Sequence, residues 1–221
     1  MIASYLDSTN LKNDGTYEDI VKLCEDAKLY KMAAVCVLPY RVSLAQKLLA
    51  DSEVKVCTVV GFPLGADHYT TKVAAARQAL KDGAQEIDVV INILAVKDGD
   101  YEVVERELKA ILDLKQEYDF QLKVIVETAL LTEDELINLI KIINNTKCDY
   151  IKTSTGFSIR GVSLEDIHII NAHKSKDLKI KASGGIRTGE FAQQLIDLGV
   201  ERIGTSSAVK IIEETKKGED Y

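Results

Sequence analysis

The sequence predicts an α/β protein that folds as a closed (β/α)₈ barrel, and three observations support this prediction. Short runs of β-branched and apolar residues alternate with longer segments of helical period. Eight such pairs follow one another along the 221 residues, and alternation of this kind predicts a parallel sheet covered by helices. The chain has only two prolines and no linker-like stretch, so we expect a single domain over residues 1–221. Eight units of this size close into a barrel.

The expected strands are apolar runs bounded by polar residues, proline or glycine. They lie at residues 4–6, 33–38, 55–61, 85–92, 121–127, 149–154, 179–183 and 201–205. The alternative architecture is an open doubly wound sheet. That fold is favoured by a G-x-G-x-x-G turn after the first strand, and here the glycine-rich turns come late in the chain instead.

Helices are expected between these strands. Capping boxes begin three of them, at Thr16, Thr132 and Ser163, each followed three residues later by an acidic residue. Further helices are expected over residues 42–50, 70–81 and 188–198, and one has four apolar residues on a single face: Val104, Leu108, Ile111 and Leu112. A last amphipathic helix leads into a polar tail, residues 216–221, which we expect to be frayed.

Composition and charge exclude several classes of function. The formal net charge of −7 argues against a nucleic-acid partner, because a duplex-binding protein needs a basic face. The first residues have no basic flank followed by an apolar run, and no stretch holds eighteen unbroken apolar residues, so we expect no membrane association. The cysteines are widely spaced and form no C-x-x-C pair: Cys24, Cys36, Cys57 and Cys148. We interpret them as reduced core residues of a cytoplasmic protein.

The histidines give no sign of a metal site. No cysteine lies at metal-ligand spacing from a histidine. Two of the three histidines, His168 and His173, fall in a predicted helix, and His68 lies in a loop. We expect all three at the surface and no metal in the protein.

Two late strands carry the same unusual motif, Ile-Lys-x-Ser, around Lys152 and Lys181. A lysine in a buried strand is costly unless it has a partner or a task. The side-chain period of two places both lysines on the inner face of neighbouring strands. By the same parity Asp88 and Asn92 share a face of the fourth strand. On the fifth strand, Lys123 and Glu127 also face the barrel mouth.

Two adjacent amines indicate covalent chemistry. A protonated amine does not attack a carbonyl, and a second cation together with desolvation lowers the pKa of one amine of such a pair. That lysine can form a Schiff base with an aldehyde or ketone, while the other stays charged and Asp88 moves protons. The alternative is a purely structural layer of ion pairs. Matching motifs around Lys152 and Lys181, together with an inward aspartate, favour chemistry.

Glycine-rich turns after the last strands predict a phosphate site. In barrels of this kind a phosphate binds to backbone N–H groups after the seventh and eighth strands. Singly, each turn could be a helix cap, but their occurrence in two successive loops favours an anion. Together with the turn that follows Lys152, the residues expected to bind substrate or its phosphate are Thr155, Gly156, Gly184, Gly185, Arg187, Gly204, Ser206 and Ser207.

Motifs along nearly the whole chain resemble the class I deoxyribose-phosphate aldolases. They are Asp7-x-Thr9, Val60-Gly-Phe-Pro-Leu-Gly65, Glu86-Ile-Asp-Val-Val-Ile-Asn92, Lys123-Val-Ile-Val-Glu-Thr128, Ile151-Lys-Thr-Ser-Thr-Gly-Phe157, Lys181-Ala-Ser-Gly-Gly-Ile-Arg187 and Gly204-Thr-Ser-Ser207. The resemblance implies that Lys152 is the Schiff-base lysine, with Asp88 and Lys181 as a proton-relay pair. It implies pocket-lining roles for Asp7, Thr9 and Lys123, cleavage of 2-deoxyribose 5-phosphate, and no metal or organic cofactor.

The sequence departs from this family at Ser8, where many relatives have histidine, and at Leu94, where many have glycine. Neither position is one of the expected catalytic groups. Two other functions stay open at this point. One is an enzyme for a different sugar phosphate, either an aldolase or an isomerase. The other is a non-catalytic barrel that binds a sugar phosphate. A homodimer is also left open.

Overall fold

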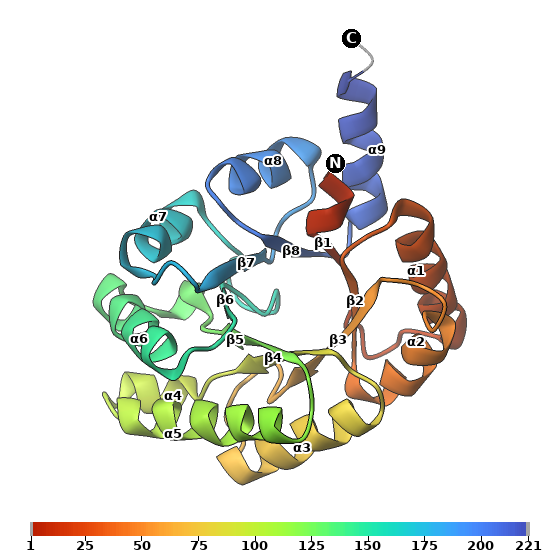
Figure 1. The fold of residues 1–221 in the computed structure, drawn as a ribbon. Helices are drawn as coiled ribbons and strands as arrows, with labels where there is room; N and C mark the ends of the chain where they lie inside the picture. Colours follow the sequence, from red (N-terminus) through yellow and green to blue (C-terminus); the bar gives the residue numbers. More distant parts are fainter. Residues whose placement is uncertain (1, 220–221) are drawn as a thin grey trace.

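The computed structural model describes residues 2–219 and has eight parallel strands in a closed barrel, with helices around the outside (Figure 1). Each strand pairs with the next, and β8 pairs with β1, where Ser8 lies beside Thr205. This confirms the predicted (β/α)₈ architecture and excludes the open sheet. The strands are β1 (Leu6–Asn10), β2 (Ala34–Val37), β3 (Lys55–Val60), β4 (Glu86–Val90), β5 (Gln121–Ile125), β6 (Tyr150–Lys152), β7 (Lys179–Ser183) and β8 (Arg202–Thr205).

The helices follow the strands as expected. They are α1 (Tyr17–Tyr30), α2 (Val42–Leu48), α3 (Tyr69–Lys81), α4 (Ile93–Lys97), α5 (Tyr101–Leu112), α6 (Glu133–Thr146), α7 (Leu164–His173), α8 (Gly189–Asp197) and α9 (Ala208–Glu219), with short 3₁₀ turns η1 (Ile2–Tyr5), η2 (Pro39–Arg41), η3 (Asp113–Gln116) and η4 (Thr128–Leu130). The predicted capping boxes at Thr16, Thr132 and Ser163 are all formed. The tail was expected to be frayed from residue 216, but α9 stays helical as far as Glu219; residues 220 and 221 lie outside the described part.

The first strand was predicted at the wrong place. Residues Ile2–Tyr5 form a 3₁₀ turn, and the strand begins at Leu6 and runs through four polar residues to Asn10. The strand β1 therefore lacks the apolar run from which the other strands were predicted. The physical reason is that Asp7 points into a polar barrel interior, where it meets Lys181. Burial of polar groups on this strand is stabilised by ion pairs rather than by apolar contact.

An extensive apolar core lies between the strands and the helices. A smaller apolar cluster also lies against β2 and β3, formed by Leu11, Ala34, Cys36, Cys57 and Val59. All four cysteines are buried and free, and the three histidines are exposed, as expected. Among the described residues, no helix is long and apolar enough to cross a bilayer.

A buried ion pair joins α3 to α5. The Lys72 Nζ atom lies 2.7 Å from Glu107 Oε2, and both side chains are almost completely shielded from solvent. Lys72 also donates to the backbone oxygen of Val90 at 2.8 Å, and Glu107 accepts from the backbone N–H of Asn92 at 2.8 Å. Burial raises the pKa of the Glu107 carboxyl despite this lysine. The pair therefore ties two helices to the end of β4.

We expect the substitution Lys72→Met to lower the free energy of unfolding by roughly 3 kcal/mol, because it leaves a buried carboxylate without its cation. The double substitution Lys72→Met with Glu107→Gln should recover part of that loss, since the glutamine still accepts from Asn92. Urea denaturation measures both values. The matched control is Lys22→Met, which removes an exposed pair with Asp26 and should change stability little. An equal loss in the control would contradict the prediction.

Candidate active site

The side chain of Asp88, on β4, is the centre of an ion-pair cluster inside the barrel. Its Oδ2 atom accepts from Lys152 Nζ at 2.7 Å and from Lys181 Nζ at 2.7 Å. The two lysines lie side by side in the register of β6 and β7, as the motif predicted. All three side chains are buried. The expected catalytic groups are thus brought together on a single oxygen atom.

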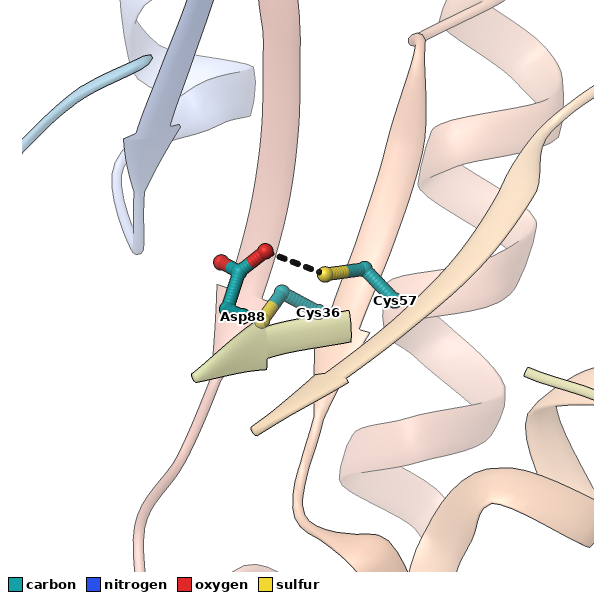
Figure 2. Close-up of side chains that lie close together, drawn as sticks. All are labelled: Cys36, Cys57 and Asp88. Atoms are coloured by element: carbon teal, nitrogen blue, oxygen red, sulfur yellow. Dashed lines mark hydrogen bonds between the residues drawn. The ribbon is translucent and has the colours of Figure 1, made fainter. Parts of the chain in front are cut away.

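The other carboxylate oxygen of Asp88 faces β5 and β3. Its Oδ1 atom accepts from Lys123 Nζ at 2.9 Å and from the thiol of Cys57 at 3.1 Å. Figure 2 shows Cys57 pointing at the carboxylate from the neighbouring strand, with Cys36 beside it. The contact between a core cysteine and Asp88 was not predicted from the sequence. Each oxygen of the carboxylate therefore has at least two hydrogen-bond donors.

A second layer of charges lies around this centre, and the sequence interpretation missed two of its members, Glu86 and Arg202. Lys181 Nζ also contacts Asp7 Oδ2 at 2.5 Å, and Lys123 Nζ also contacts Glu86 Oε2 at 2.6 Å. Arg202, on β8, bridges the two carboxylates: it donates to Asp7 and, at 2.6 Å, to Glu86 Oε1. Asp7 and Lys123 thus support the site from below, rather than lining a pocket as the resemblance implied.

The partners of each cation single out one lysine. Among the described residues, Lys123, Lys181 and Arg202 each contact two carboxylate groups, whereas Lys152 contacts Asp88 alone. Four cations therefore meet three carboxylates: Asp7, Glu86 and Asp88. When all groups are ionised, the cluster carries one excess positive charge, and loss of one amine proton makes it neutral. Loss from Lys152 disturbs the fewest ion pairs.

The pKa shifts show which groups stay charged. Burial alone would raise the pKa of Asp88, but the charges of Lys123, Lys152 and Lys181 outweigh it and hold that pKa well below its usual value. Burial opposes the charged form of Lys181, yet Asp7 and Asp88 raise its pKa above the ordinary range. Lys181 is therefore not the amine with the lowered pKa that the lysine pair predicted. It stays an ammonium group beside Lys152.

A cavity of about 370 Å³ opens above the cluster, and Lys152 is its only member that reaches it among the described residues. Asp88 and Lys181 do not line this cavity. Seven of the eight residues expected to bind substrate or phosphate do: Thr155, Gly156, Gly184, Gly185, Arg187, Gly204 and Ser206. Ser207 is the exception, and its backbone N–H donates to Thr205 Oγ1 at 2.9 Å. Thr9 also lines the cavity, in agreement with the resemblance.

Hydroxyl groups fix the ends of the two lysine strands to each other. Ser183 donates through its hydroxyl to the backbone oxygen of Ser154 at 2.5 Å, and Thr153 Oγ1 accepts from the backbone N–H of Ser183 at 3.1 Å. These contacts explain the serine of the second Ile-Lys-x-Ser motif, Ser183, whereas the hydroxyl of Ser154 in the first motif donates to Thr153 Oγ1 at 3.1 Å. They hold the backbone that carries Lys152 and Lys181 in one register.

Glu127 has a role that its expected place at the barrel mouth did not reveal. Its backbone is left-handed, with φ of 56°, and its side chain is buried. The carboxylate accepts from the backbone N–H of Thr155 at 3.2 Å and from the Thr155 hydroxyl. Glu127 thus positions the loop after Lys152. Asn92, expected on the inner face with Asp88, instead caps α4 by accepting from Ala95 at 3.2 Å.

The loop after β7 requires glycine because two backbones meet there. Gly184 has φ of 81°, and a Cβ atom at this position would lie 2.8 Å from the Cα of Gly161. A Cβ atom on Gly161 would in turn lie 2.0 Å from the backbone oxygen of Gly184. The loop after β6 is therefore packed directly against the glycine turn at the cavity.

Two groups of side chains have the spacing of metal ligands, Cys36 with Cys57 and Asp88, and Asp7 with Cys57 and Glu86. The donor chemistry fits a metal poorly. Their carboxylates already accept from lysine and arginine, so a metal ion would have to displace those cations. Burial raises the pKa of the Cys57 thiol well above its usual value, and a thiol must lose its proton to bind a metal.

Comparison with known proteins places this arrangement among the aldolases. Residues 1–206 match the model of the DeoC/LacD family aldolases. A deoxyribose-phosphate aldolase of Thermococcus gammatolerans is 47% identical over 220 residues, covering 99% of this chain and 98% of the relative. One from Caldicellulosiruptor saccharolyticus is 48% identical over 214 residues, covering 96% of this chain and 97% of the relative.

A solved structure agrees. The deoxyribose phosphate aldolase of Aeropyrum pernix, whose structure is described as a unique tetramer, superposes with a TM-score of 0.90 at 34% identity, covering 97% of this chain and 91% of that one. Fold and site together define a barrel aldolase with amines at its centre. The chain belongs to the DeoC/LacD aldolase family.

The free energy of unfolding should decrease at acidic pH, because Asp7 becomes protonated there. Burial disfavours its charged form, but Lys181 and Arg202 outweigh burial and lower its pKa from 3.8 to about 2. A carboxyl group whose pKa is lowered in the folded protein stabilises the fold at pH values above its pKa in the unfolded chain. This stabilisation is lost as the pH falls through its pKa in the folded protein.

We therefore expect the stability difference between the wild type and Asp7→Asn to narrow by about 2 kcal/mol as the solution is taken from about pH 5 to about pH 2. Urea denaturation at a series of pH values gives the difference. A difference that is constant with pH would show that Asp7 does not carry this linkage.

Proposed function

We propose that this protein is a class I aldolase that reversibly cleaves 2-deoxyribose 5-phosphate to glyceraldehyde 3-phosphate and acetaldehyde, with Lys152 as the Schiff-base lysine. The observation that carries the proposal is the position of Lys152. Among the residues that the structure describes, it is the one amine of the cluster that reaches the cavity, and it is also the one held by a single carboxylate. The names of the relatives, deoxyribose-phosphate aldolases, support the substrate.

The first half of the reaction uses the neutral amine of Lys152. Its nitrogen adds to the aldehyde carbon of the open-chain sugar, and the resulting carbinolamine takes up one proton and loses water to give an iminium ion, which acts as an electron sink. Loss of the proton from Lys152 leaves the buried cluster neutral, because its remaining three cations match three carboxylates. The ionised Asp88, 2.7 Å away, then faces the positive charge of the iminium.

The second half breaks the carbon–carbon bond. The hydroxyl beyond that bond loses its proton, glyceraldehyde 3-phosphate leaves, and the enamine is protonated and hydrolysed to acetaldehyde. We assign the proton relay to Asp88 and Lys181, acting through water. Because both lie beneath the cavity and Asp88 is kept ionised, their part is to orient the Lys152 nitrogen and to pass the proton on rather than to retain it.

The other end of the substrate is bound by the loops after β7 and β8. Gly184 and Gly185 both have left-handed backbones, and with Gly204 they line the cavity beside Ser206 and Arg187. This arrangement suits a phosphate. A sugar-phosphate sensor would have no use for a buried amine cluster beneath such a cradle. A homodimer, a cytoplasmic location and a single domain over residues 1–221 stay predictions from the sequence.

Borohydride reduction in the presence of acetaldehyde should add one ethyl group to Lys152, because reduction traps the iminium as a stable amine. Peptide mass spectrometry locates the added mass. In the variant Lys152→Met the adduct should be absent, and turnover of 2-deoxyribose 5-phosphate should fall roughly 10⁴-fold or more. An unmodified Lys152 in protein that still cleaves the sugar phosphate would refute covalent catalysis by this residue.

Removal of the arginine at the phosphate loops should weaken binding more than chemistry. We expect Arg187→Met to raise KM for 2-deoxyribose 5-phosphate about tenfold or more with a smaller change in kcat, since a charge-assisted contact to the phosphate is lost. Steady-state kinetics measures both constants. The matched control is Arg106→Met, which removes an exposed arginine that lies over Tyr69, outside the cavity. Equal effects of the two substitutions would contradict the assignment.

A further inference from the structure

The loop between β1 and α1 borders the substrate cavity next to the loop after β8. Barrel closure pairs β1 with β8, so that Ser8 lies beside Thr205. This pairing brings the end of β1 next to the loop that contains Gly204 and Ser206. Residues 9–12 of the β1–α1 segment line the same cavity as Arg187 and the glycine turns. Among them, Lys12 is the charged one.

The backbone that carries Lys12 is anchored from several directions. Leu11 is buried in the small apolar cluster against β2 and β3. The Lys12 backbone N–H donates to Asn10 Oδ1 at 3.3 Å, and its backbone oxygen accepts from Gly15 at 3.3 Å. Arg41 in turn donates to the backbone oxygen of Gly15 at 3.0 Å. The base of the Lys12 side chain is therefore fixed, while the side chain itself is exposed.

The ammonium group of Lys12 has no ion pair or hydrogen bond within the part of the chain that the structure describes. A carboxylate that its charge influences is Asp19. The pKa of Asp19 is lowered mainly by hydrogen bonds with Thr16, and the charge of Lys12 contributes least. The Asp19 carboxylate is already engaged, because it accepts from the Thr16 backbone N–H at 2.8 Å. Within residues 2–219, Lys12 is thus a cation without an ionic partner on an anchored loop.

The charges that line the cavity are all of one sign. Its described lining includes three basic residues, Lys12, Lys152 and Arg187, and no aspartate or glutamate. Arg187 likewise makes no ion pair within the described residues. Two cations without an ion pair among the described residues therefore line the cavity with the glycine turns, each from a different loop. Such a site is complementary to a dianion held between them.

We propose that Lys12 is a further binding residue, which contacts the substrate's phosphate from the loop after β1, while Arg187 contacts it from the loop after β7. The inference rests on the proposed function and extends its phosphate site from the last two loops to the first one. The phosphate then lies between the backbone N–H groups of the glycine turns and two cations, one from each of these loops. The sequence motif around Asp7 and Thr9 gave no indication of this role.

The variant Lys12→Met tests the proposal, with cleavage of 2-deoxyribose 5-phosphate compared with cleavage of 2-deoxyribose, which lacks the phosphate. We expect KM for the phosphorylated sugar to rise about tenfold, a change in kcat/KM for the plain sugar of less than about twofold, and recovery in Lys12→Arg. The control is Lys47→Met, an exposed lysine of α2 that does not line the cavity. This control should leave KM and kcat/KM unchanged for both sugars.

Equal changes of kcat/KM for the two sugars in Lys12→Met, or no change for either, would overturn the proposal. Calorimetric titration with inorganic phosphate separates this failure from a failure of the proposed activity, because it needs no turnover. Binding of inorganic phosphate that weakens in Lys12→Met supports the role of Lys12 even if the wild type does not cleave 2-deoxyribose 5-phosphate. Failure of the wild type to cleave 2-deoxyribose 5-phosphate would overturn only the aldolase proposal.

Discussion

The carboxylate of Asp88 is the interaction on which the interior of this barrel depends. Three lysines from three different strands donate to its two oxygens. A buried lysine without a carboxylate is strongly destabilising, whereas a paired one is tolerated. The three strands β5, β6 and β7 therefore share a single electrostatic centre on β4. Loss of that centre would leave four cations with two carboxylates, so the fold and the chemistry cannot be separated at this position.

Much of the site could be predicted from strand parity. A period of two, applied to the fourth, fifth, sixth and seventh strands, is enough to bring Asp88, Lys123, Lys152 and Lys181 together, and the register confirms it. The first strand could not be found, because apolar content was the signal and its residues are polar. Arg202 was missed for a related reason: its partners, Asp7 and Glu86, come from distant strands that only barrel closure brings near.

The depth of each side chain within the barrel also could not be predicted from the sequence. Parity shows that a side chain points inward but not whether it reaches the cavity or stays beneath it. Lys152 and Lys181 have the same motif, yet one lines the cavity and the other is fully buried between two carboxylates. The division of labour between nucleophile and supporting cation follows from that difference in depth. It is a property of the packed interior and not of the motif.

The contact between Gly161 and Gly184 joins the loop after the nucleophile's strand to the glycine turn by backbone alone. Neither loop can shift along the other without a steric clash, and the hydroxyl of Ser183 fixes the strands beneath them. The spacing between the loop after β6 and the glycine turn after β7 is consequently set by main-chain atoms. The fixed distance between these two loops therefore selects bound molecules by their length.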